Sequence, residues 1–343
     1  MKGSPYGIHR VLGPAGTLPQ AAWKISNDME ICDNEILIDV DILNIDAASF
    51  TQIKKAAAMD VEKIKQTMLD IVAKRGKHHN PVTGSGGMLV GRVSAIGASL
   101  QDRDLKVGDR IATLVSLSLT PLVIDKIKAV HIDRDQVEIE GRAVLFESGI
   151  YAKLPADMPD ALALAVLDVA GAPAQTARLV KPGDTVLIIG GGGKSGTLCM
   201  YEARKRAGVT GTIIGIGSSA KSCQRIRDLG WADHVLEVDA TNAVAVMDAV
   251  AAVTGGKLAD VTINCVNIPG TEMASVLATR DYGTVYFFSM ATSFTAAALG
   301  AEGVGKDVNM IIGNGYTHRH AEISLHLLRE SPQLRQLFET IYV

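Results

Sequence analysis

A run of glycines joins an apolar segment to a segment that begins a helix. The apolar residues are Val186–Ile189, and the run that follows comprises Gly190, Gly191, Gly192, Gly193, Lys194, Ser195 and Gly196. Glycines let the backbone turn tightly and approach a phosphate closely, while the N–H groups and dipole at a helix start attract its negative charge. The run therefore predicts a site for the pyrophosphate of a nicotinamide or flavin dinucleotide.

The segments after this run bear on its interpretation, because a glycine-rich turn also occurs without a ligand. The pattern predicts a helix over 197–207, an apolar strand over 211–217 and a further helix from Ala220. Strand, glycine turn, helix and strand form a βαβ unit, which favours the dinucleotide. A triphosphate-binding loop would need a glycine where Ile188 stands, so the spacing excludes that alternative.

The residues after the second strand indicate which dinucleotide is bound. NAD-specific sites place an acidic residue there to accept the ribose hydroxyls, whereas NADP sites use small polar and basic residues. This chain has Ser218, Ser219, Lys221 and, one helical turn on, Arg225. We therefore expect NADP⁺ to be accepted at least as well as NAD⁺. The nicotinamide half is expected at the ends of other strands, beside Cys265, Val266, Ser289 and Met290.

Composition limits the class of partner. The 343 residues carry a formal net charge of −3, with acidic and basic residues interleaved. No basic patch indicates nucleic acid or an anionic membrane, so a small molecule is the expected partner. The sequence has no apolar run of roughly 18 residues and no signal-like start, which favours a cytoplasmic protein. The four cysteines are widely scattered, and we expect buried free thiols rather than disulfides or a zinc cluster.

The chain before residue 160 consists mainly of short β-type runs. Strands are expected over 35–43, 89–96, 110–115 and 143–146, separated by Gly, Asn and Asp. One helix is expected over 53–74, where apolar residues recur at helical spacing and Gly76 follows as a stop signal. Its apolar stripe is interpreted as a packing face. This part predicts a β-barrel-like domain.

Beyond Pro159, helices and strands alternate. A helix is expected over 161–170, and the apolar strands are expected over 185–189, 213–217, 235–238, 261–264 and 283–289. Strands that are apolar throughout are typical of a parallel sheet covered by helices on both faces. The pattern predicts an α/β doubly wound domain over 161–308. The remaining residues, 309–343, contain a turn at 313–315 and a helix to about Arg329, and we expect them to pack back on the first domain.

Several motifs resemble those of the medium-chain dehydrogenase/reductase superfamily. They are Gly91–Gly97, Val107–Ile111, Val180–Ile188 and Leu229–Asp233. The resemblance implies a GroES-like substrate domain over 1–160 and a Rossmann domain over 161–308. A dimer is usual among proteins of this superfamily, so a homodimer is expected.

The zinc pattern of many members is missing. Where they have Gly-His-Glu, this chain has Gly86-Gly87-Met88, and the position of their first zinc cysteine falls on Asp46. Zinc needs three or four ligands that converge on one point. The resemblance therefore implies a zinc-free member.

Longer blocks resemble a narrower family, the L-erythro-3,5-diaminohexanoate dehydrogenases of anaerobic lysine fermentation. These blocks are residues 3–10, 19–24, 78–91 and 146–155. The resemblance implies oxidative deamination of the 3-amino group to give 5-amino-3-oxohexanoate, with NAD(P)⁺ as hydride acceptor. Such an amine needs only to lose its ammonium proton before the hydride leaves, so a carboxylate or histidine base suffices where an alcohol would need a Lewis acid.

The implied substrate carries two ammonium groups and one carboxylate. Asp46 and Asp168, the latter near the third zinc-ligand position of the superfamily, are the first candidates to bind or deprotonate an amine, and Glu147 and His79 are further catalytic candidates. Arg10 could clamp the carboxylate. Substrate contacts are also expected at Ser49, Ser85 and Gly86. Each charged candidate has a structural alternative, such as a surface salt bridge for Glu147, an ordinary surface position for Arg10 and a solvated side chain for His79.

Two other functions fit the same motifs. A zinc-free NADPH-dependent quinone or enoyl reductase would share the fold but would have an apolar substrate pocket, and its activity would not depend on Asp46 or Asp168. A nucleotide-binding protein that has lost catalysis would be stabilised by NADP⁺ without turning over any amine.

Overall fold

The computed structural model describes residues 1–289, 291–313 and 315–343, and the chain divides into two compact units. The first unit is Met1–Asp157 and the second is Met158–Val343, so the division falls close to the expected boundary at residue 160. Each unit has its own hydrophobic core. In the described residues, no helix is both long enough and apolar enough to cross a membrane.

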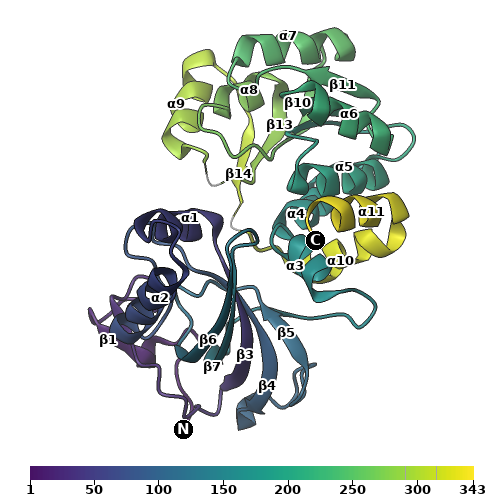
Figure 1. The fold of residues 1–343 in the computed structure, drawn as a ribbon. Coiled ribbons are helices and arrows are strands. Elements are labelled where there is room, and N and C mark those ends of the chain that lie inside the picture. The colour runs from purple at the N-terminus through teal and green to yellow at the C-terminus, as the bar shows by residue number, and fades with distance from the viewer. Residues whose placement is uncertain (290, 314) are drawn as a thin grey trace. The chain divides into compact units, whose positions relative to one another are not determined.

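The first unit is built on a six-stranded sheet in which all neighbouring strands are antiparallel (Figure 1). Its strands lie in the order β6-β7-β3-β4-β5-β8. They are β3 (Glu35–Ile45), β4 (Gly87–Ile96), β5 (Arg110–Thr113), β6 (Leu122–His131), β7 (Gln136–Phe146) and β8 (Tyr151–Lys153). Alternate residues of β3, such as Ile36, Ile38 and Val40, are buried in the core, as the period of a strand requires. A short ribbon of β1 (Val11–Gly13) and β2 (Lys24–Ile25) and the 3₁₀ turns Ile8–Arg10 and Ala98–Leu100 complete the unit.

Two helices stand where the sequence predicts one over 53–74. They are α1 (Ala47–Ala56) and α2 (Val61–Arg75). The chain breaks between them because Ala58 and Met59 have φ of 49° and 63°, and because the Asp60 carboxylate caps α2. Apolar residues keep helical spacing across this break, which explains the incorrect prediction. The expected C-terminal end of the helical segment is confirmed, since Gly76 follows α2 with a φ of 71°.

The second unit contains the predicted parallel sheet, in the order β11-β10-β9-β12-β13-β14. Its strands are β9 (Thr185–Ile189), β10 (Thr212–Gly217), β11 (His234–Glu237), β12 (Ala259–Asn264), β13 (Thr279–Phe287) and β14 (Asn309–Ile312). The strand order reverses between β9 and β12, which is the point at which doubly wound sheets bind ligands. The Rossmann-type fold is therefore confirmed.

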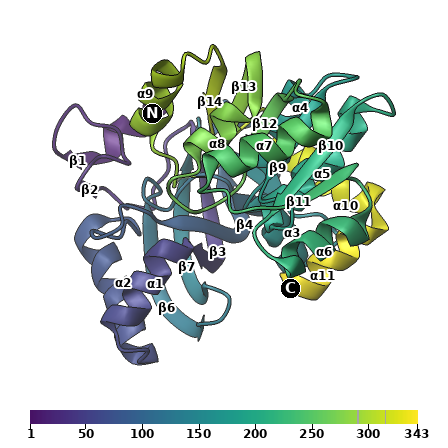
Figure 2. The ribbon, with the colours of Figure 1, turned by 90° about the horizontal axis from the view of Figure 1, so that it is seen from above.

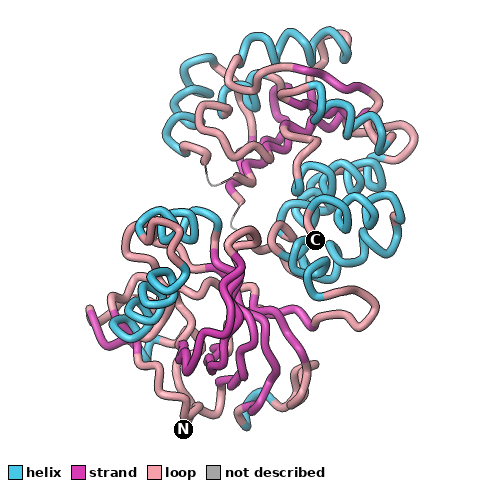
Figure 3. Tube along the Cα trace, viewed as in Figure 1, coloured by secondary structure: helices cyan, strands magenta, loops and turns pink. Residues whose placement is uncertain are grey.

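Helices cover both faces of this sheet (Figure 3). The helices of the second unit are α3 (Asp160–Leu167), α4 (Gly171–Leu179), α5 (Lys194–Ala207), α6 (Ala220–Leu229), α7 (Ala243–Thr254), α8 (Glu272–Leu277), α9 (Phe294–Val304), α10 (His320–Glu330) and α11 (Pro332–Ile341). Val186 and Ile188 of β9 pack with α5 and α6, whereas Leu187 and Ile189 pack with α7 and α8. The fully apolar strand follows from this double burial.

The end of the chain differs from the expectation that residues 309–343 return to the first domain. Residues 309–312 form β14, which pairs with β13 at the edge of the parallel sheet. Helix α10 contacts α3, α4 and α5, and α11 contacts α3, as Figures 1 and 2 show in yellow beside these helices. The expectation is corrected by these contacts. The expectation was wrong because a strand of only four residues shows too short a pattern of alternation to be recognised in the sequence. Asn314 of the predicted turn lies outside the described residues.

Candidate functional site

The glycine run forms the turn between β9 and α5. Gly190 has a φ of 83°, and the N–H groups of Gly190 and Gly191 both donate to the Ile216 carbonyl oxygen, at 3.0 and 2.9 Å. Gly193 N–H donates to the Gly190 carbonyl oxygen at 3.0 Å, and α5 begins at the next residue. The turn thus carries the chain from the sheet edge directly into a helix N-terminus.

Close packing requires the glycines of this turn. A Cβ at Gly196 would lie 2.1 Å from the Gly190 carbonyl oxygen, and one at Gly192 would lie 2.5 Å from Ser222 Oγ. Tight turning and close approach of helix to strand are what a dinucleotide-binding turn needs. The residues present therefore fit a dinucleotide cofactor.

A cavity of about 280 Å³ opens at the carboxyl ends of β9, β10, β11 and β12. Of the predicted cofactor residues, Gly190, Gly192, Gly193, Ser218, Cys265 and Val266 line it. The sequence reasoning missed Ser222, Val238, Asp239, Ala240, Thr241 and Thr271, which line it as well. Asp239 directly follows the strand expected over 235–238, so the rule that ligands bind at strand ends could have found it.

Hydrogen bonds fix two walls of this cavity. Thr241 donates to Asp239 Oδ1 from its N–H and its hydroxyl, at 2.9 and 2.8 Å, and these bonds hold the pKa of the Asp239 carboxyl below its usual value. Buried Asn264, the last residue of β12, accepts from Val266 N–H at 3.0 Å and donates to Thr271 Oγ1 at 2.9 Å. Val266 is therefore positioned by a buried amide.

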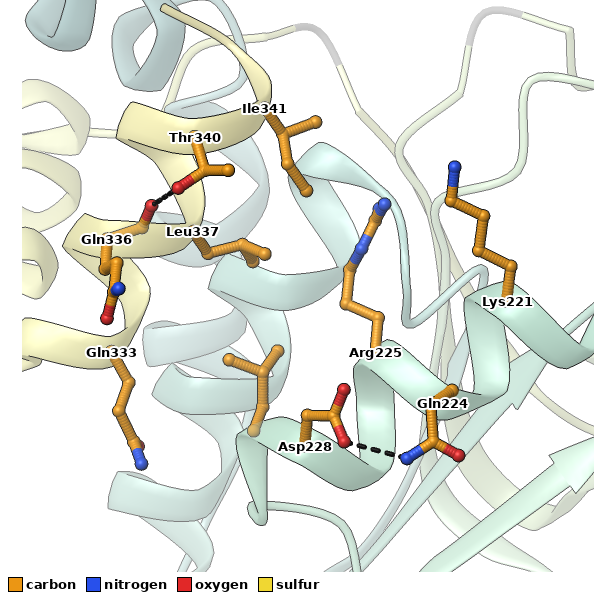
Figure 4. A pocket seen from close by; sticks show the side chains of 10 residues that line it. Lys221, Gln224, Arg225, Asp228, Gln333, Gln336, Leu337, Thr340 and Ile341 are labelled. Atoms are coloured by element: carbon orange, nitrogen blue, oxygen red, sulfur yellow. Dashed lines mark hydrogen bonds between the residues drawn. The ribbon is translucent and has the colours of Figure 1, made fainter.

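A second hollow, an open groove of about 670 Å³, lies between α6 and α11 (Figure 4). Lys221 and Arg225 line it from α6, and Leu337 and Ile341 are among the residues that line it from α11. Arg225 Nη1 also donates to the Gly192 carbonyl oxygen at 2.5 Å, so its guanidinium reaches the glycine turn. Lys221 and Arg225 line this groove and not the cavity at the strand ends, although Arg225 is bonded to Gly192 of the glycine turn. The contribution of α11 was missed because the tail was expected on the first domain.

Ser219, Ser195 and Ser289 line neither cavity. Ser219 Oγ caps α6 by accepting from Ser222 N–H at 3.3 Å. Ser195 is buried in the first turn of α5. Ser289 Oγ donates to Asn267 Oδ1 at 3.1 Å and accepts from Ala291 N–H at 3.1 Å. Met290 lies outside the described residues.

Asp168 and Lys194, predicted separately, form an ion pair. Lys194 Nζ lies 2.9 Å from Asp168 Oδ2, and the Tyr342 ring centre lies 5.4 Å from the same nitrogen. Lys194 is the first residue of α5, and Asp168 directly follows α3. Both side chains are partly exposed, at 29% and 45%. A carboxylate that solvent can reach therefore stands beside the glycine turn.

In the first unit, the Asp46 carboxylate is bound to the glycine loop that precedes β4. Gly86 N–H donates to Asp46 Oδ2 at 3.0 Å, and Asp46 N–H donates to the Gly86 carbonyl oxygen at 3.4 Å. A Cβ at Gly86 would lie 2.5 Å from Ser118 N, and one at Gly87 would lie 2.1 Å from the Asn44 carbonyl oxygen. The loop therefore needs glycine at both positions, and Asp46 and Gly86 are brought together as predicted.

Asn80, which the sequence reasoning missed, ties this loop to α1. Its Nδ2 donates to Ser49 Oγ at 3.0 Å and to Gln52 Oε1 at 2.9 Å. Its N–H donates to the Ser85 carbonyl oxygen at 3.1 Å, and its carbonyl oxygen accepts from Gly84 N–H at 2.9 Å. Ser49 is fully buried beneath these bonds. A loop sequence of this kind gives no local sign that Asn80 is buried and holds several hydrogen bonds.

Two histidines and two cations precede the loop. Burial lowers the pKa of His78 to about 4, and burial followed by the charges of Lys77 and Arg75 lowers the pKa of His79 to about 4. Neither ring nitrogen of His78 has a hydrogen-bond partner among the described residues. Lys77 Nζ is buried and donates to the Pro19 carbonyl oxygen at 2.5 Å, and burial together with Arg75 lowers its pKa to about 8. His79 is thus neutral near pH 7 and a weaker base than an ordinary histidine.

Two other predicted site residues lie at the opposite end of β3 from Asp46. Arg10 is buried and binds both carboxylate oxygens of Glu35, the first residue of β3, at 2.7 and 2.6 Å. Glu147 Oε2 accepts from Asn34 Nδ2 at 2.8 Å at the same end. Asp46 follows the last residue of β3, about 35 Å away at the usual rise of a strand. The predictions that Arg10 clamps the substrate and that Glu147 belongs to one site with Asp46 are corrected by these positions.

His9, Cys32 and Glu35 form the one group within the described residues whose ligand atoms come within 4.8 Å of one another, as a metal site would require. Glu35 already binds Arg10 and accepts from His9 Nε2 at 2.9 Å. His9 Nδ1 accepts from Ser4 N–H at 3.0 Å, which fixes the proton on Nε2. The donor set is therefore occupied by its own hydrogen bonds and does not fit a metal ion.

Solved structures share the fold of the whole chain. A mycobacterial protein complexed with NADPH is 18% identical with a TM-score of 0.53, covering 97% of this chain and 88% of its own. A mycobacterial quinone oxidoreductase is 18% identical with a TM-score of 0.54, covering 93% of this chain and 91% of its own. At this identity the likeness shows the fold alone.

Similarity in sequence is much higher to one family. Residues 9–155 match the model of the L-erythro-3,5-diaminohexanoate dehydrogenase N-terminal domain. The L-erythro-3,5-diaminohexanoate dehydrogenase of Acetoanaerobium sticklandii is 61% identical over 100% of both chains. That of Fusobacterium nucleatum is 59% identical over 100% of this chain and 99% of its own. The chain belongs to the L-erythro-3,5-diaminohexanoate dehydrogenase family.

Proposed function

We propose that this protein catalyses the NAD(P)-dependent oxidative deamination of L-erythro-3,5-diaminohexanoate to 5-amino-3-oxohexanoate, as a step of lysine fermentation. The observation that carries the proposal is the 61% identity, over the full length of both chains, to a relative named for this dehydrogenase. The glycine turn and the cavity at the carboxyl ends of the strands support the cofactor half of the reaction.

The cofactor is proposed to be a nicotinamide dinucleotide, with NADP⁺ accepted at least as well as NAD⁺. When bound, it accepts a hydride from the substrate carbon. The N–H groups at the start of α5 would hold its pyrophosphate, since a helix N-terminus attracts anions. Ser218 follows β10, at the position where an acidic residue would select NAD⁺. Lys221 and Arg225 supply positive charge on α6, the next helix in the chain.

Asp46 and Asp168 are proposed to act on the amines. Asp46 is exposed, and the bond from Gly86 N–H positions its carboxylate to bind an ammonium group. Asp168 is held by Lys194 and stays accessible to solvent. The lowered pKa of His79 makes this imidazole the weaker candidate for the base. We propose that no zinc takes part, because an amine that has lost its proton can release a hydride without a Lewis acid.

The experiment that tests the function identifies both products. Protein incubated with NADP⁺ and L-erythro-3,5-diaminohexanoate should release ammonium and form 5-amino-3-oxohexanoate in equal amounts, measured by mass spectrometry and an ammonium assay. An unchanged diamino acid, with reduction of quinones by NADPH, would overturn the proposal in favour of a quinone or enoyl reductase.

We also propose a homodimer. Strand β14 lies at the edge of the sheet with Ile312 52% exposed, and α9 exposes Phe294 at 65% and Leu299 at 63%. An edge strand beside exposed apolar side chains is a surface that proteins usually cover. Sedimentation equilibrium should give twice the 36.2 kDa mass of one chain. The cytoplasmic location stays a prediction.

A further inference from the structure

Two of the four free thiols lie against each other. Cys265 Sγ is 3.9 Å from Cys199 Sγ, although 66 residues separate them in sequence. By contrast, Cys223 Sγ lies near two carbonyl oxygens, that of Gly217 at 3.6 Å and that of Leu236 at 3.7 Å. Two thiols at this separation need only a small movement to form a bond, because a disulfide joins sulfurs about 2.05 Å apart.

The pair connects the core of the second unit with the cofactor cavity. Cys199 lies on α5 and is fully buried against Val186 and Ile188. Cys265 directly follows β12, is half-buried and lines the 280 Å³ cavity. Its N–H donates to the Ile189 carbonyl oxygen at 2.9 Å, which anchors it beside the glycine turn. One thiol of the pair is therefore reachable from the cavity and the other is not.

We propose that Cys199 and Cys265 form an intramolecular disulfide when hydrogen peroxide oxidises them, and that this bond weakens dinucleotide binding. Cys265 attacks one oxygen of the peroxide, the O–O bond breaks, and Cys265 becomes a sulfenic acid as the first water leaves. The Cys199 sulfur then attacks the Cys265 sulfur, the S–O bond breaks, and a second water leaves. Two thiols are oxidised by two electrons in total, and the peroxide is reduced to two waters.

The difference in burial between the two cysteines determines which of them reacts first. Burial raises the pKa of the Cys199 thiol well above its ordinary value, so Cys199 reacts slowly with a reagent in solution. Cys265 meets the reagent first because it lines the cavity. Cys199 then attacks only the sulfur that it already contacts. A bound dinucleotide would fill the cavity and shield Cys265.

The effect on binding follows from the neighbours of Cys265. A Cβ at Gly190 would lie 2.9 Å from Val266 Cγ2, so the residue after Cys265 is in contact with the glycine turn. Formation of the disulfide draws Cys265 toward α5 and moves Val266 with it. The wall of the cavity and the turn that receives the pyrophosphate are then displaced together.

The experiment treats the full-length protein with hydrogen peroxide, blocks the remaining thiols and maps the peptides without reduction. A cross-link between the peptides of Cys199 and Cys265 is expected, and NADP⁺ present during treatment should suppress it. The Kd for NADP⁺, measured by calorimetry, should rise by about tenfold or more, because the displaced wall of the cavity no longer fits the dinucleotide. Reduction of the disulfide should restore the original Kd. Cys223→Ser is the matched control, because it changes an equally buried cysteine near the same cavity and should leave the cross-link and the shift intact.

Cys199→Ser and Cys265→Ser should each abolish both the cross-link and the change in Kd. Oxidation of Cys265 to acids without a cross-link, or a cross-link that leaves Kd unchanged, would overturn the proposal. The change in Kd rests on the proposed cofactor, whereas the cross-link is detected without it. Failure of the reduced protein to bind either dinucleotide would therefore contradict the proposed function alone, and the peptide map would still decide whether the disulfide forms.

Discussion

The carboxylate of Asp168 lies 2.9 Å from the ammonium nitrogen of Lys194, the residue at which the glycine turn becomes helix α5. The pair joins the end of α3 to the N-terminus of α5, where the pyrophosphate is proposed to bind, and it leaves 45% of the Asp168 side chain exposed. An ion pair that only joined two helices at the surface would contribute little to stability. Its place beside the proposed cofactor site gives it a testable role in the reaction.

We expect Asp168→Asn to lower kcat/KM for the diamino acid by about 100-fold or more, the usual contribution of a positioned base. Lys194→Arg should keep most of the activity, because a guanidinium still pairs with the carboxylate. The control is Glu339→Gln, which breaks an ion pair of equal length on α11, Arg335 with Glu339 at 2.9 Å. Steady-state kinetics with both cofactors would measure these effects. Equal activity of Asp168→Asn and Glu339→Gln would remove Asp168 from the mechanism.

Asp46→Asn keeps an oxygen that can accept from Gly86 N–H but removes the charge that binds an ammonium group. We expect kcat/KM to fall by about tenfold or more, as it does when a charged hydrogen bond is lost, with the melting temperature nearly unchanged. Asp41→Asn is the matched control, because Asp41 pairs with Arg110 on the same sheet and is 47% exposed. If both variants retain full activity, the substrate does not bind at Asp46.

Lys221 and Arg225 should differ in their effects on the cofactor. Lys221→Met should raise KM for NADP⁺ by about tenfold, the order expected for one charged contact, and leave KM for NAD⁺ nearly unchanged. Arg225→Met should raise both, because its guanidinium also binds the Gly192 carbonyl oxygen in the glycine turn. Arg227→Met, on the exposed face of the same helix, is the control. A strict requirement for NAD⁺ in the unchanged protein would refute the proposed preference.

Acid should destabilise the fold through His78. Its pKa is about 4 in the folded protein and near its ordinary 6.5 when unfolded, so the unfolded chain binds the extra proton between these values. The free energy of unfolding should therefore fall as pH drops from 6.5 to 4, by up to about 3 kcal/mol from this group. His78→Leu should reduce the slope, whereas His326→Gln, at a side chain 60% exposed, should not. Urea denaturation at several pH values measures the slopes, and identical slopes in all three proteins would exclude His78 as the cause.

The sequence predicted those parts of the fold that a single continuous segment is enough to recognise. The glycine run and the uniformly apolar strands depend on neighbours in sequence, and both the Rossmann-type sheet and the family prediction were confirmed. The break at Met59 was missed because apolar spacing continues through it. The helical pattern records which face is buried, but it does not record where the backbone leaves the helix.

Pairs that are distant in sequence could not be predicted. Arg10 was assigned to the substrate because nothing near it in sequence shows that Glu35 occupies its guanidinium. Asn80 was missed for the same reason, since its partners Ser49 and Gln52 lie about thirty residues earlier. Asp46 and Gly86 were assigned to one site because the zinc pattern of the superfamily, rather than the local sequence, connects their positions. The structure then shows a hydrogen bond between them.

The central claim is that this protein oxidises a diamino acid with a nicotinamide cofactor. The most direct measurement follows the absorbance of the reduced nicotinamide after L-erythro-3,5-diaminohexanoate is added to the protein with NADP⁺ or NAD⁺. We predict a rise that depends on the diamino acid, that is at least as fast with NADP⁺ as with NAD⁺, and that Asp168→Asn nearly abolishes. No rise with either cofactor, under conditions in which the protein binds NADP⁺, would contradict the claim.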